Sequence, residues 1–450
     1  MVIMKTHYQI AEVAEMLNVS KDTLRRWEQS GKLHSVRHPM NNYRAYRLED
    51  LKQFEQLGLL LEKRFESHKE VAPKQRYTVM ELFAGAGGLA LGLEKAGLQC
   101  AVLNEFNKDA CNTLRLNRPY WTVLEGDVRQ QDFTPYAGKI DVLTGGFPCQ
   151  AFSFAGKRLG FEDARGTLFY EFARAVKEVQ PLICVGENVR GLLAHEGGQT
   201  LKGMVDVLDE LGYDVVPPKV LKAIHYGVPQ KRERLLIVGL KRGEHLKFHW
   251  PEISDTVFNL KDALKAGTLF DSDVPKSHGQ AYPTSKKAIM DLIPPGGYWR
   301  DLPLELQKAY MKGSFHLGGG KTGMARRIAW DEPSLTLTCA PAQKQTERCH
   351  PEETRPFTVR EYARIQTFPD AWQFTGSMTA QYAQIGNAVP VNLAYAVGLE
   401  LVRTLNEYVT HNDSAKTAFK IAYSSPDRPN RPKQLTVQAK SHAATDLEAA

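Results

Sequence analysis

The 450-residue chain lacks any long uninterrupted apolar run, so the sequence predicts no membrane-spanning helix and no membrane partner. The first residues, MVIMKTHYQIAEVAEML, are too polar and become amphipathic too early to predict a signal peptide. The sequence therefore predicts a cytoplasmic protein. No internal repeat is present.

Cysteine is sparse, with six residues that lie far apart and form no C-x-x-C pair. Zinc knuckles use paired cysteines, and disulfide frameworks are typical of short secreted chains, so we expect neither a metal site nor disulfides. The reduced thiols would be Cys100, Cys111, Cys149, Cys184, Cys339 and Cys349.

A strong excess of one charge is absent too. The net charge of +7 is compatible with a polyanionic partner but does not require one. A chain of 450 residues exceeds what a single hydrophobic core usually serves, so we expect two or three folded units.

Residues 1–71 have the pattern of a winged helix-turn-helix. Apolar residues at helical spacing precede a turn at residues 18–20, and Ser20 can cap a second helix that begins at Lys21 and ends near Gly31. Residues 41–42, Asn-Asn, predict the tip of a hairpin wing.

This segment resembles the MerR and excisionase-like regulators, and the resemblance implies contacts to duplex DNA. The alternative is a helical packing module with a solvated basic face. The residues expected to contact DNA are Arg25, Arg26 and Arg44.

Residues 77–240 alternate apolar, strand-like runs with amphipathic helices. The clearest strands are YTVMELF, CAVLNEF, KIDVLTGGF, PLICVGENV and RERLLIVGL, a rhythm that predicts a doubly wound α/β domain. Residues 241–355 lose this rhythm and predict either a loop-rich recognition domain or a poorly ordered insertion. Periodicity returns over residues 356–408, and residues 409–450 have the composition of a disordered tail.

The segment ELFAGAGGLALGLEKAG, residues 81–97, predicts a strand, a glycine turn and a helix. Gly85 and Gly87 would let the backbone approach a ligand closely. Glu105 follows about 20 residues later, where an acid commonly binds ribose hydroxyls, and Asp127 could accept a hydrogen bond from an adenine. These residues alone do not distinguish a dinucleotide from S-adenosylmethionine.

Cys149 stands after a proline in GGFPCQAFSFAG, where the predicted strand KIDVLTGGF must end and the chain turn out of the sheet. Functional residues are concentrated in loops at such positions. From this motif alone, an inert buried thiol is the alternative.

Three further motifs follow the glycine turn in order: FPCQ (147–150), GENVRG (186–191) and QKRER (230–234). Together with GTLFYEFAR, RPFTVREYARIQTFPD and QIGNAVPVNLAYAVG, they make residues 77–406 closely resemble the cytosine-C5 DNA methyltransferase family. The resemblance implies a doubly wound, S-adenosylmethionine-dependent core with an inserted target recognition domain at residues 241–355. It also implies methylation of cytosine C5 in a short duplex DNA sequence, within a restriction-modification system.

The chemistry of that reaction gives these residues roles. Cytosine C5 is a weak nucleophile, but a thiolate added to C6 makes it enamine-like, and the target base must be flipped out to be reached. Cys149 is the expected nucleophile, Glu187 the acid at N3 and Arg234 the cation near O2. By resemblance, Arg232 and Asn188 hold the site's geometry, and the cofactor pocket is lined by Phe83, Gly85, Gly87, Glu105, Asp127, Pro148, Leu168 and Asn387.

Two other functions stay open. One branch of this family methylates transfer RNA, but the long stretch 241–355 and the DNA-binding type of N-terminus argue against an RNA substrate. A transcription regulator with an inert methyltransferase body is the second, and the intact Cys149, Glu187 and Arg234 argue against it. Repression of its own operon is nevertheless compatible with methylation.

For partners, we expect double-stranded DNA bound by a monomer at the methylation target, with the N-terminal domain as the place for any dimer. A cognate restriction endonuclease is implied only by the resemblance. The stretch QKQTERCHPEETRPFTVREYARIQTFPD resembles enzymes that modify GGNCC-like sites.

Overall fold

The structure is a computed structural model, and its side chains and backbone are described over most of the chain. The described residues are 7–10, 13–14, 21–37, 44–51, 71–148, 167–316 and 322–424. Most of the predicted first helix of the N-terminal segment and the wing tip at residues 41–42 lie outside them. So do Cys149 and residues 425–450.

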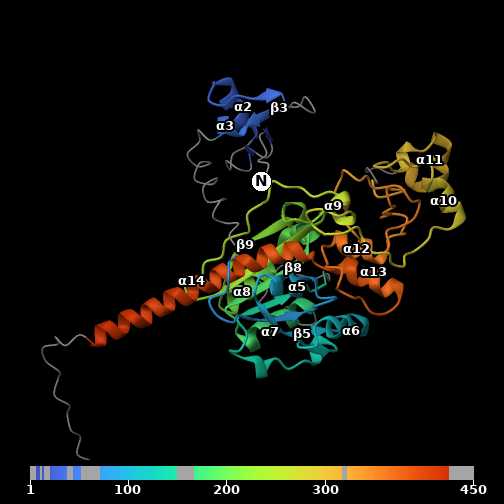
Figure 1. The fold of residues 1–450 in the computed structure, drawn as a ribbon. Helices are drawn as coiled ribbons and strands as arrows, with labels where there is room; N and C mark the ends of the chain where they lie inside the picture. Colours follow the sequence, from blue (N-terminus) through green and yellow to red (C-terminus); the bar gives the residue numbers. More distant parts are fainter. Residues whose placement is uncertain are drawn as a thin grey trace, which may run out of the picture.

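The N-terminal segment folds around a small core of its own (Figure 1). The helix predicted from Lys21 is α2, Lys21–Gln29, and it is followed by Gly31 in the left-handed region at φ 71°. Glycine adopts this conformation without steric cost, which explains why the helix stops there. The strands pair antiparallel in the order β1-β3-β2, with bounds His7–Gln9, Arg44–Arg47 and Val36–Arg37, and α3 spans Leu48–Leu51.

A seven-stranded sheet forms the centre of the large domain, in the order β6-β5-β4-β7-β8-β11-β9. Strand β11 runs antiparallel to both of its neighbours, β8 and β9, and the other adjacent strands pair in parallel. The bounds are β4 Thr78–Leu82, β5 Gln99–Glu105, β6 Thr122–Glu125, β7 Val142–Gly145, β8 Ile183–Val189, β9 Tyr213–Lys222 and β11 Glu233–Lys241. The predicted α/β class is confirmed, and the predicted strands all lie in this sheet.

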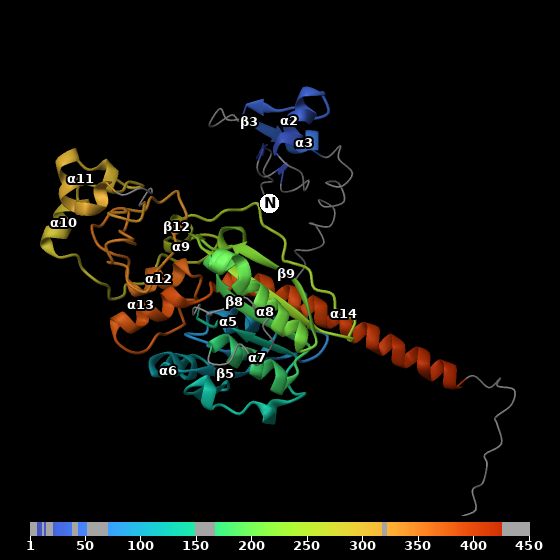
Figure 2. The ribbon, with the colours of Figure 1, turned by 180° about the vertical axis from the view of Figure 1, so that it is seen from behind.

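Helices cover both faces of the sheet, as a doubly wound fold requires. Strand side chains alternate between two cores: Val79 and Val238 pack on one face, Met80 and Ile237 on the other. In Figure 1 α14 lies in front of the sheet, and in Figure 2 α8 does. The first face carries α5 Gly88–Lys95, α6 Lys108–Asn117 and α14 Val391–Ser424, and the second carries α7 Leu168–Val179 and α8 Gln199–Glu210.

Helices α5 and α14 cross at very short range because glycines stand at the contact. A Cβ on Gly92 would lie 2.3 Å from Ala394 Cβ, and one on Gly398 would lie 2.7 Å from Ala96 Cβ. Such approaches leave no room for a side chain. The glycine turn that begins α5 and the chain that leads into α14 are thereby held side by side.

The irregular stretch contains an ordered unit with its own apolar core, set apart from the sheet in Figure 1. Its buried members run from Tyr282 to Cys349, inside the predicted range 241–355, whereas Leu260 and Leu264 belong to the large core. The helices of this region are α9 Leu260–Leu264, α10 Thr284–Met290 and α11 Leu304–Met311. They are followed by β12 Ser334–Leu335, paired with β10 Gln230–Lys231, and by α12 Val359–Ile365 and α13 Met378–Asn387.

The last helix is longer than predicted. The sequence predicted periodic structure only to residue 408 and a disordered tail from residue 409, but α14 continues to Ser424. Residues 409–424 contain no proline or glycine, and Pro426 is the first residue that cannot continue a helix, so the earlier end was wrong.

Within the described residues, Met378–Asp413 alone is long and apolar enough to cross a membrane by length and composition. Of its most apolar window, 61% is buried inside the protein, which identifies it as part of the core.

Candidate active site

Four charged residues meet in a cavity at the carboxyl ends of the parallel strands. Side chains alternate along a strand, and these four are in phase with residues of the core that contains α5 and α14. Open α/β sheets commonly bind ligands at this edge. The four residues are Glu81, Glu105, Glu187 and Arg234.

The cavity has a volume of about 500 Å³ and combines apolar walls with these charges. Five residues predicted to hold the cofactor line it, and so do three residues predicted for catalysis. The first set is Phe83, Gly85, Glu105, Pro148 and Asn387, and the second is Glu187, Asn188 and Arg234.

The glycine turn forms one wall through an unusual backbone path. Phe83, Gly85 and Gly87 have φ values of 57°, 54° and 83°, in the left-handed region. The Gly85 amide donates to Glu105 Oε2 at 2.7 Å, and the Asn107 amide donates to Glu105 Oε1 at 2.7 Å. Glu105 therefore fixes the turn while its carboxylate faces the cavity.

The end of β7 forms a second wall next to Glu187. A Cβ on Gly146 would lie 3.0 Å from Glu187 Oε2, so this glycine lets the chain pass close to the carboxylate. The buried Asn188 donates from Nδ2 to the Phe147 carbonyl at 2.9 Å, one residue before Pro148. These contacts hold the chain just before Cys149, which itself lies outside the described residues.

Glu187 and Arg234 form a nearly buried ion pair. Arg234 Nε lies 2.5 Å from Glu187 Oε1, and the side chains are 11% and 13% exposed. Burial raises the pKa of Glu187, although Arg234 and Arg232 oppose that shift, and burial lowers the pKa of Arg234. The arrangement favours a carboxyl group that holds a proton at higher pH than an ordinary glutamate.

Arg232 does not line the cavity but braces it. Its Nη1 donates to the Leu337 carbonyl at 3.2 Å, and its Nη2 donates to the Gly386 carbonyl at 2.9 Å. Burial lowers the pKa of Arg232 to about 9. Because Gly386 precedes Asn387, this side chain ties the end of β10 to the wall contributed by α13.

Three residues predicted for the cofactor pocket lie elsewhere. Gly87 caps α5, and a Cβ there would lie 2.8 Å from Leu114 Cδ2. Asp127 accepts a hydrogen bond from the Arg129 amide at 3.0 Å and pairs with Arg129 Nε at 3.3 Å. Leu168 begins α7 and packs against the second core. Their roles toward a cofactor stay predictions.

Two residues at the cavity were not singled out from the sequence. Glu81 is only 3% exposed and lines the cavity, although it stood in the quoted motif ELFAGAGG as part of a strand. Phe106 is 75% exposed, and the residues on either side of it, Glu105 and Asn107, line the cavity. The available sequence signal was an aromatic residue directly after the predicted ribose acid.

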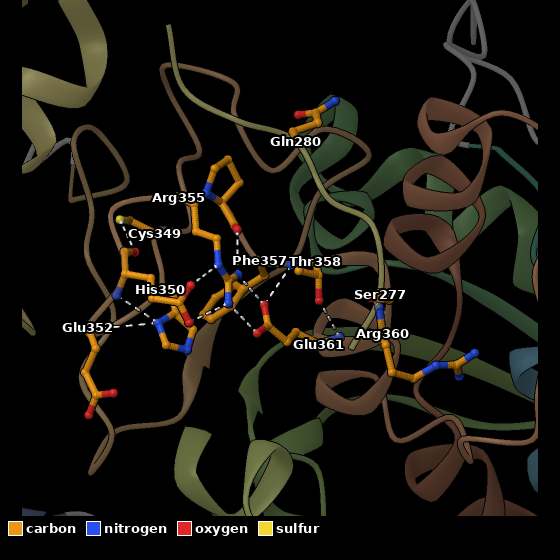
Figure 3. Close-up of polar contacts among 12 residues, drawn as sticks. Ser277, Gln280, Cys349, His350, Glu352, Arg355, Phe357, Thr358, Arg360 and Glu361 are labelled. Atoms are coloured by element: carbon orange, nitrogen blue, oxygen red, sulfur yellow. Dashed lines mark hydrogen bonds and ion pairs between the residues drawn. The ribbon is translucent and has the colours of Figure 1, made fainter. Parts of the chain in front are cut away.

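A polar cluster joins the small unit to α12 (Figure 3). Arg355 donates through both Nη atoms to Glu361, each at 2.8 Å, and Thr358 caps α12. His350 Nδ1 accepts from the Glu353 amide at 3.1 Å, and burial lowers the pKa of this imidazole. The cluster fixes the chain where it returns to the large core.

The N-terminal arginines are accessible on α2. Arg25 and Arg26 are exposed, although Arg25 Nη1 pairs with Asp22 at 2.6 Å and Arg26 Nη2 donates to Thr23 Oγ1 at 3.3 Å. Arg44 begins β3, and its side chain is outside the described part of the structure. Contacts from these residues to DNA stay predictions.

Comparison with known proteins agrees with this geometry. Residues 77–403 match the C-5 cytosine-specific DNA methylase family, and residues 9–46 match the MerR family regulatory proteins. The chain is 61% identical over 407 residues to the Type II methyltransferase M.Eco47II of Escherichia coli, covering 90% of this chain and 97% of that relative. It is 55% identical over 402 residues to M.PspPI of Psychrobacter sp. (strain TA137), covering 89% and 97%.

Two solved structures share the fold. A DNA modification methyltransferase encoded within an E. coli prophage superposes with a TM-score of 0.50 at 24% identity, covering 73% of this chain and 99% of that one. A mutant of Spodoptera frugiperda DNMT2 gives 0.50 at 16% identity, with the same two coverages. The family match spans the sheet, the cavity and every predicted catalytic residue, and the chain belongs to the C-5 cytosine-specific DNA methylases.

Proposed function

We propose that this DNA cytosine-5 methyltransferase binds S-adenosylmethionine in the cavity at the ends of β4, β5 and β8 and uses Cys149 as its nucleophile. The observation that carries the proposal is the buried Glu187–Arg234 pair beside Pro148. It places an acid and a cation next to the chain that leads into the predicted nucleophile. The setting would be cytoplasmic.

The residues present fit the cofactor's chemistry. S-adenosylmethionine carries a cationic sulfonium and an ammonium, and the cavity offers the acidic side chains of Glu81 and Glu105 besides the paired Glu187. Glu105 would accept from the ribose hydroxyls, and the exposed ring of Phe106 would cover the adenine. When bound, the cofactor supplies an electrophilic methyl group.

The protein's own residues would activate the cytosine. The Cys149 thiolate adds to C6 of the flipped base, and the electron pair of the C5–C6 double bond moves toward N3 and O2. Glu187 donates a proton at N3 while Arg234 stabilises the charge near O2. After C5 is methylated, a base removes the C5 proton, the thiolate is expelled from C6 and the N3 proton returns to Glu187, which restores the ring.

A mechanism-based probe tests this function. Duplex DNA with 5-fluorocytosine at the target cannot lose fluorine as it would a proton, so the enzyme should stay attached in the presence of S-adenosylmethionine. Cys149→Ser should form no adduct, whereas Cys339→Ser, which removes another thiol near Asn387, should retain it. A methylating wild-type enzyme that gives no adduct on a denaturing gel rules out the covalent role.

The target sequence is proposed to be GGNCC-like. Expressing the full chain in a host without cytosine methylation and mapping 5-methylcytosine across its genome tests the substrate and the sequence together. A cognate endonuclease would recognise the same sequence. Methylation confined to RNA would instead favour the RNA-methylating alternative.

We also propose that the N-terminal segment binds duplex DNA on its own account, at an operator near the coding region. The match to MerR regulators and the exposed Arg25 and Arg26 on α2 favour this second function. In the full chain, Arg25→Ala with Arg26→Ala should weaken binding to operator DNA that lacks the methylation target. Loss of phosphate contacts should also reduce the salt dependence of that binding. Unchanged binding would leave the segment a structural part of the enzyme.

A further inference from the structure

Glu81 is a buried carboxyl group that the proposed mechanism does not use. It lies on β4 with 3% of its surface exposed, and what remains exposed faces the cavity. Its Oε2 has no hydrogen-bond partner among the described residues. A buried polar atom left unpaired costs free energy, so it is expected to have a partner in some state of the protein.

The charges around Glu81 are mostly negative. Glu105 on β5 and Glu187 on β8 are the acids that act on it, and Cys100 lies near enough on β5 to interact. The Ala90 amide of α5 donates to it, and Thr144, its register partner on β7, carries a buried hydroxyl that is also unpaired. The cavity's cation, Arg234, is already paired with Glu187.

Burial and the two neighbouring carboxylates together raise the pKa of Glu81 well above that of an ordinary glutamate. The Ala90 amide opposes this shift but is the smallest of its causes. In the empty cavity the neutral form is therefore favoured. A cationic ligand in the same cavity would favour the carboxylate instead.

We propose that Glu81 is protonated in the free enzyme and ionises when S-adenosylmethionine enters, so that cofactor binding releases a proton. This inference rests on the proposed function of the cavity. The proton leaves to solvent, and the carboxylate gained on Glu81 faces a cationic group of the cofactor. In the complex the Glu81 carboxylate thereby adds one negative charge next to the sulfonium or ammonium. In the free enzyme the protonated Glu81 avoids a buried carboxylate with no cation to compensate it.

The sign of the pH dependence follows from linkage. Affinity should rise with pH between the pKa of Glu81 in the complex and its higher pKa in the free enzyme, because the complex binds fewer protons. One proton per site corresponds to a slope of at most about tenfold per pH unit. Outside this pH window the contribution of Glu81 to the affinity does not change with pH.

Calorimetry measures the released proton directly and needs no catalysis. S-adenosylmethionine is titrated into the full-length wild-type enzyme at one pH, in buffers that differ in ionisation enthalpy. The slope of the observed enthalpy against that ionisation enthalpy counts the protons released. We expect a value approaching one for the wild type at a pH between the pKa of Glu81 in the complex and its higher pKa in the free enzyme.

Glu81→Gln keeps the size and neutrality of the protonated acid but cannot ionise. Its proton release should fall by the wild-type contribution of Glu81, and its affinity should match the wild type at low pH and fall behind as pH rises. Glu105→Gln is the matched control, because it removes a carboxylate from the same cavity. That variant should bind more weakly and still release the proton, with the release shifted to lower pH because one of the two carboxylates that raise the pKa of Glu81 is removed.

The possible outcomes distinguish a failure of this inference from a failure of the proposed cofactor site. Wild-type enzyme that binds the cofactor with no buffer-dependent enthalpy at any pH overturns the proton release and leaves the cofactor site intact. If proton release persists in Glu81→Gln and disappears in Glu105→Gln, the released proton does not come from Glu81 and the proposal is wrong. Failure of the wild type to bind the cofactor at all overturns the proposed cavity itself.

Discussion

Asn188→Asp tests whether the end of β7 is positioned by a single side-chain hydrogen bond. The substitution preserves size and the acceptor for the Val189 amide, but it replaces the Nδ2 donor that holds the Phe147 carbonyl at 2.9 Å. Asn188 is 4% exposed, so water does not readily take the donor's place. A buried carbonyl left unpaired costs about 1–3 kcal/mol, and an ionised aspartate facing it would add repulsion.

The catalytic loss should exceed what this stability change explains. Phe147 lies two residues before Cys149, so a shift of its carbonyl moves the chain that leads into the proposed nucleophile. A displacement of about 1 Å in a reacting group can lower the rate roughly 100-fold. The rate of adduct formation with 5-fluorocytosine DNA should fall by that order, while affinity for S-adenosylmethionine should change little.

Asn104→Asp is the matched control. Asn104 is 2% exposed and donates from Nδ2 to the Leu124 and Gly126 carbonyls, so the same chemical change is made at the same depth beside β6. Urea unfolding should show comparable losses for the two variants, and only Asn188→Asp should slow the adduct step. Equal rates in both variants, or full activity in Asn188→Asp, would refute the positioning role.

The strand pattern and the motif order were sufficient to predict the core. β4, β5, β7, β8 and β11 each lie within an apolar run of the sequence, because buried strands of an α/β sheet need apolar residues on both faces. β9 was missed, since YDVVPPKVLK contains two prolines and alternates poorly. Prolines are tolerated there because β9 is the edge strand of the sheet.

Side-chain direction limited the prediction of the site. The resemblance assigns Asp127 and Leu168 to the cofactor pocket. In the structure Asp127 caps a short helix, Val128–Gln130, and Leu168 begins α7 and packs against the second core, so their roles toward a cofactor stay predictions. Glu81 was read as part of a strand, and its burial depends on α5 and on strands distant in the sequence. Only the packed fold brings its carboxyl beside Glu105 and Glu187.

Three further predictions address the helix crossing, the acid and the N-terminal segment. Gly92→Ala should lower the stability to urea, because its Cβ would lie 2.5 Å from the Val391 carbonyl oxygen. This clash should outweigh a gain of about 1 kcal/mol in helix propensity. Gly267→Ala is the control, because a Cβ there meets open space, and it should leave the stability unchanged. Burial raises the pKa of Glu187, and the proposed mechanism uses its protonated form, so the methylation rate should fall as pH rises through that pKa. Glu187→Gln should lose this alkaline limb together with about 100-fold or more in rate. A chain that begins at Pro73 should still methylate DNA, because Glu187, Arg234 and the cavity are complete without residues 1–71. Deletion of the N-terminal segment should instead relieve repression of a reporter driven by the upstream promoter. A soluble truncated chain without methylation activity would show that the segment belongs to the catalytic fold.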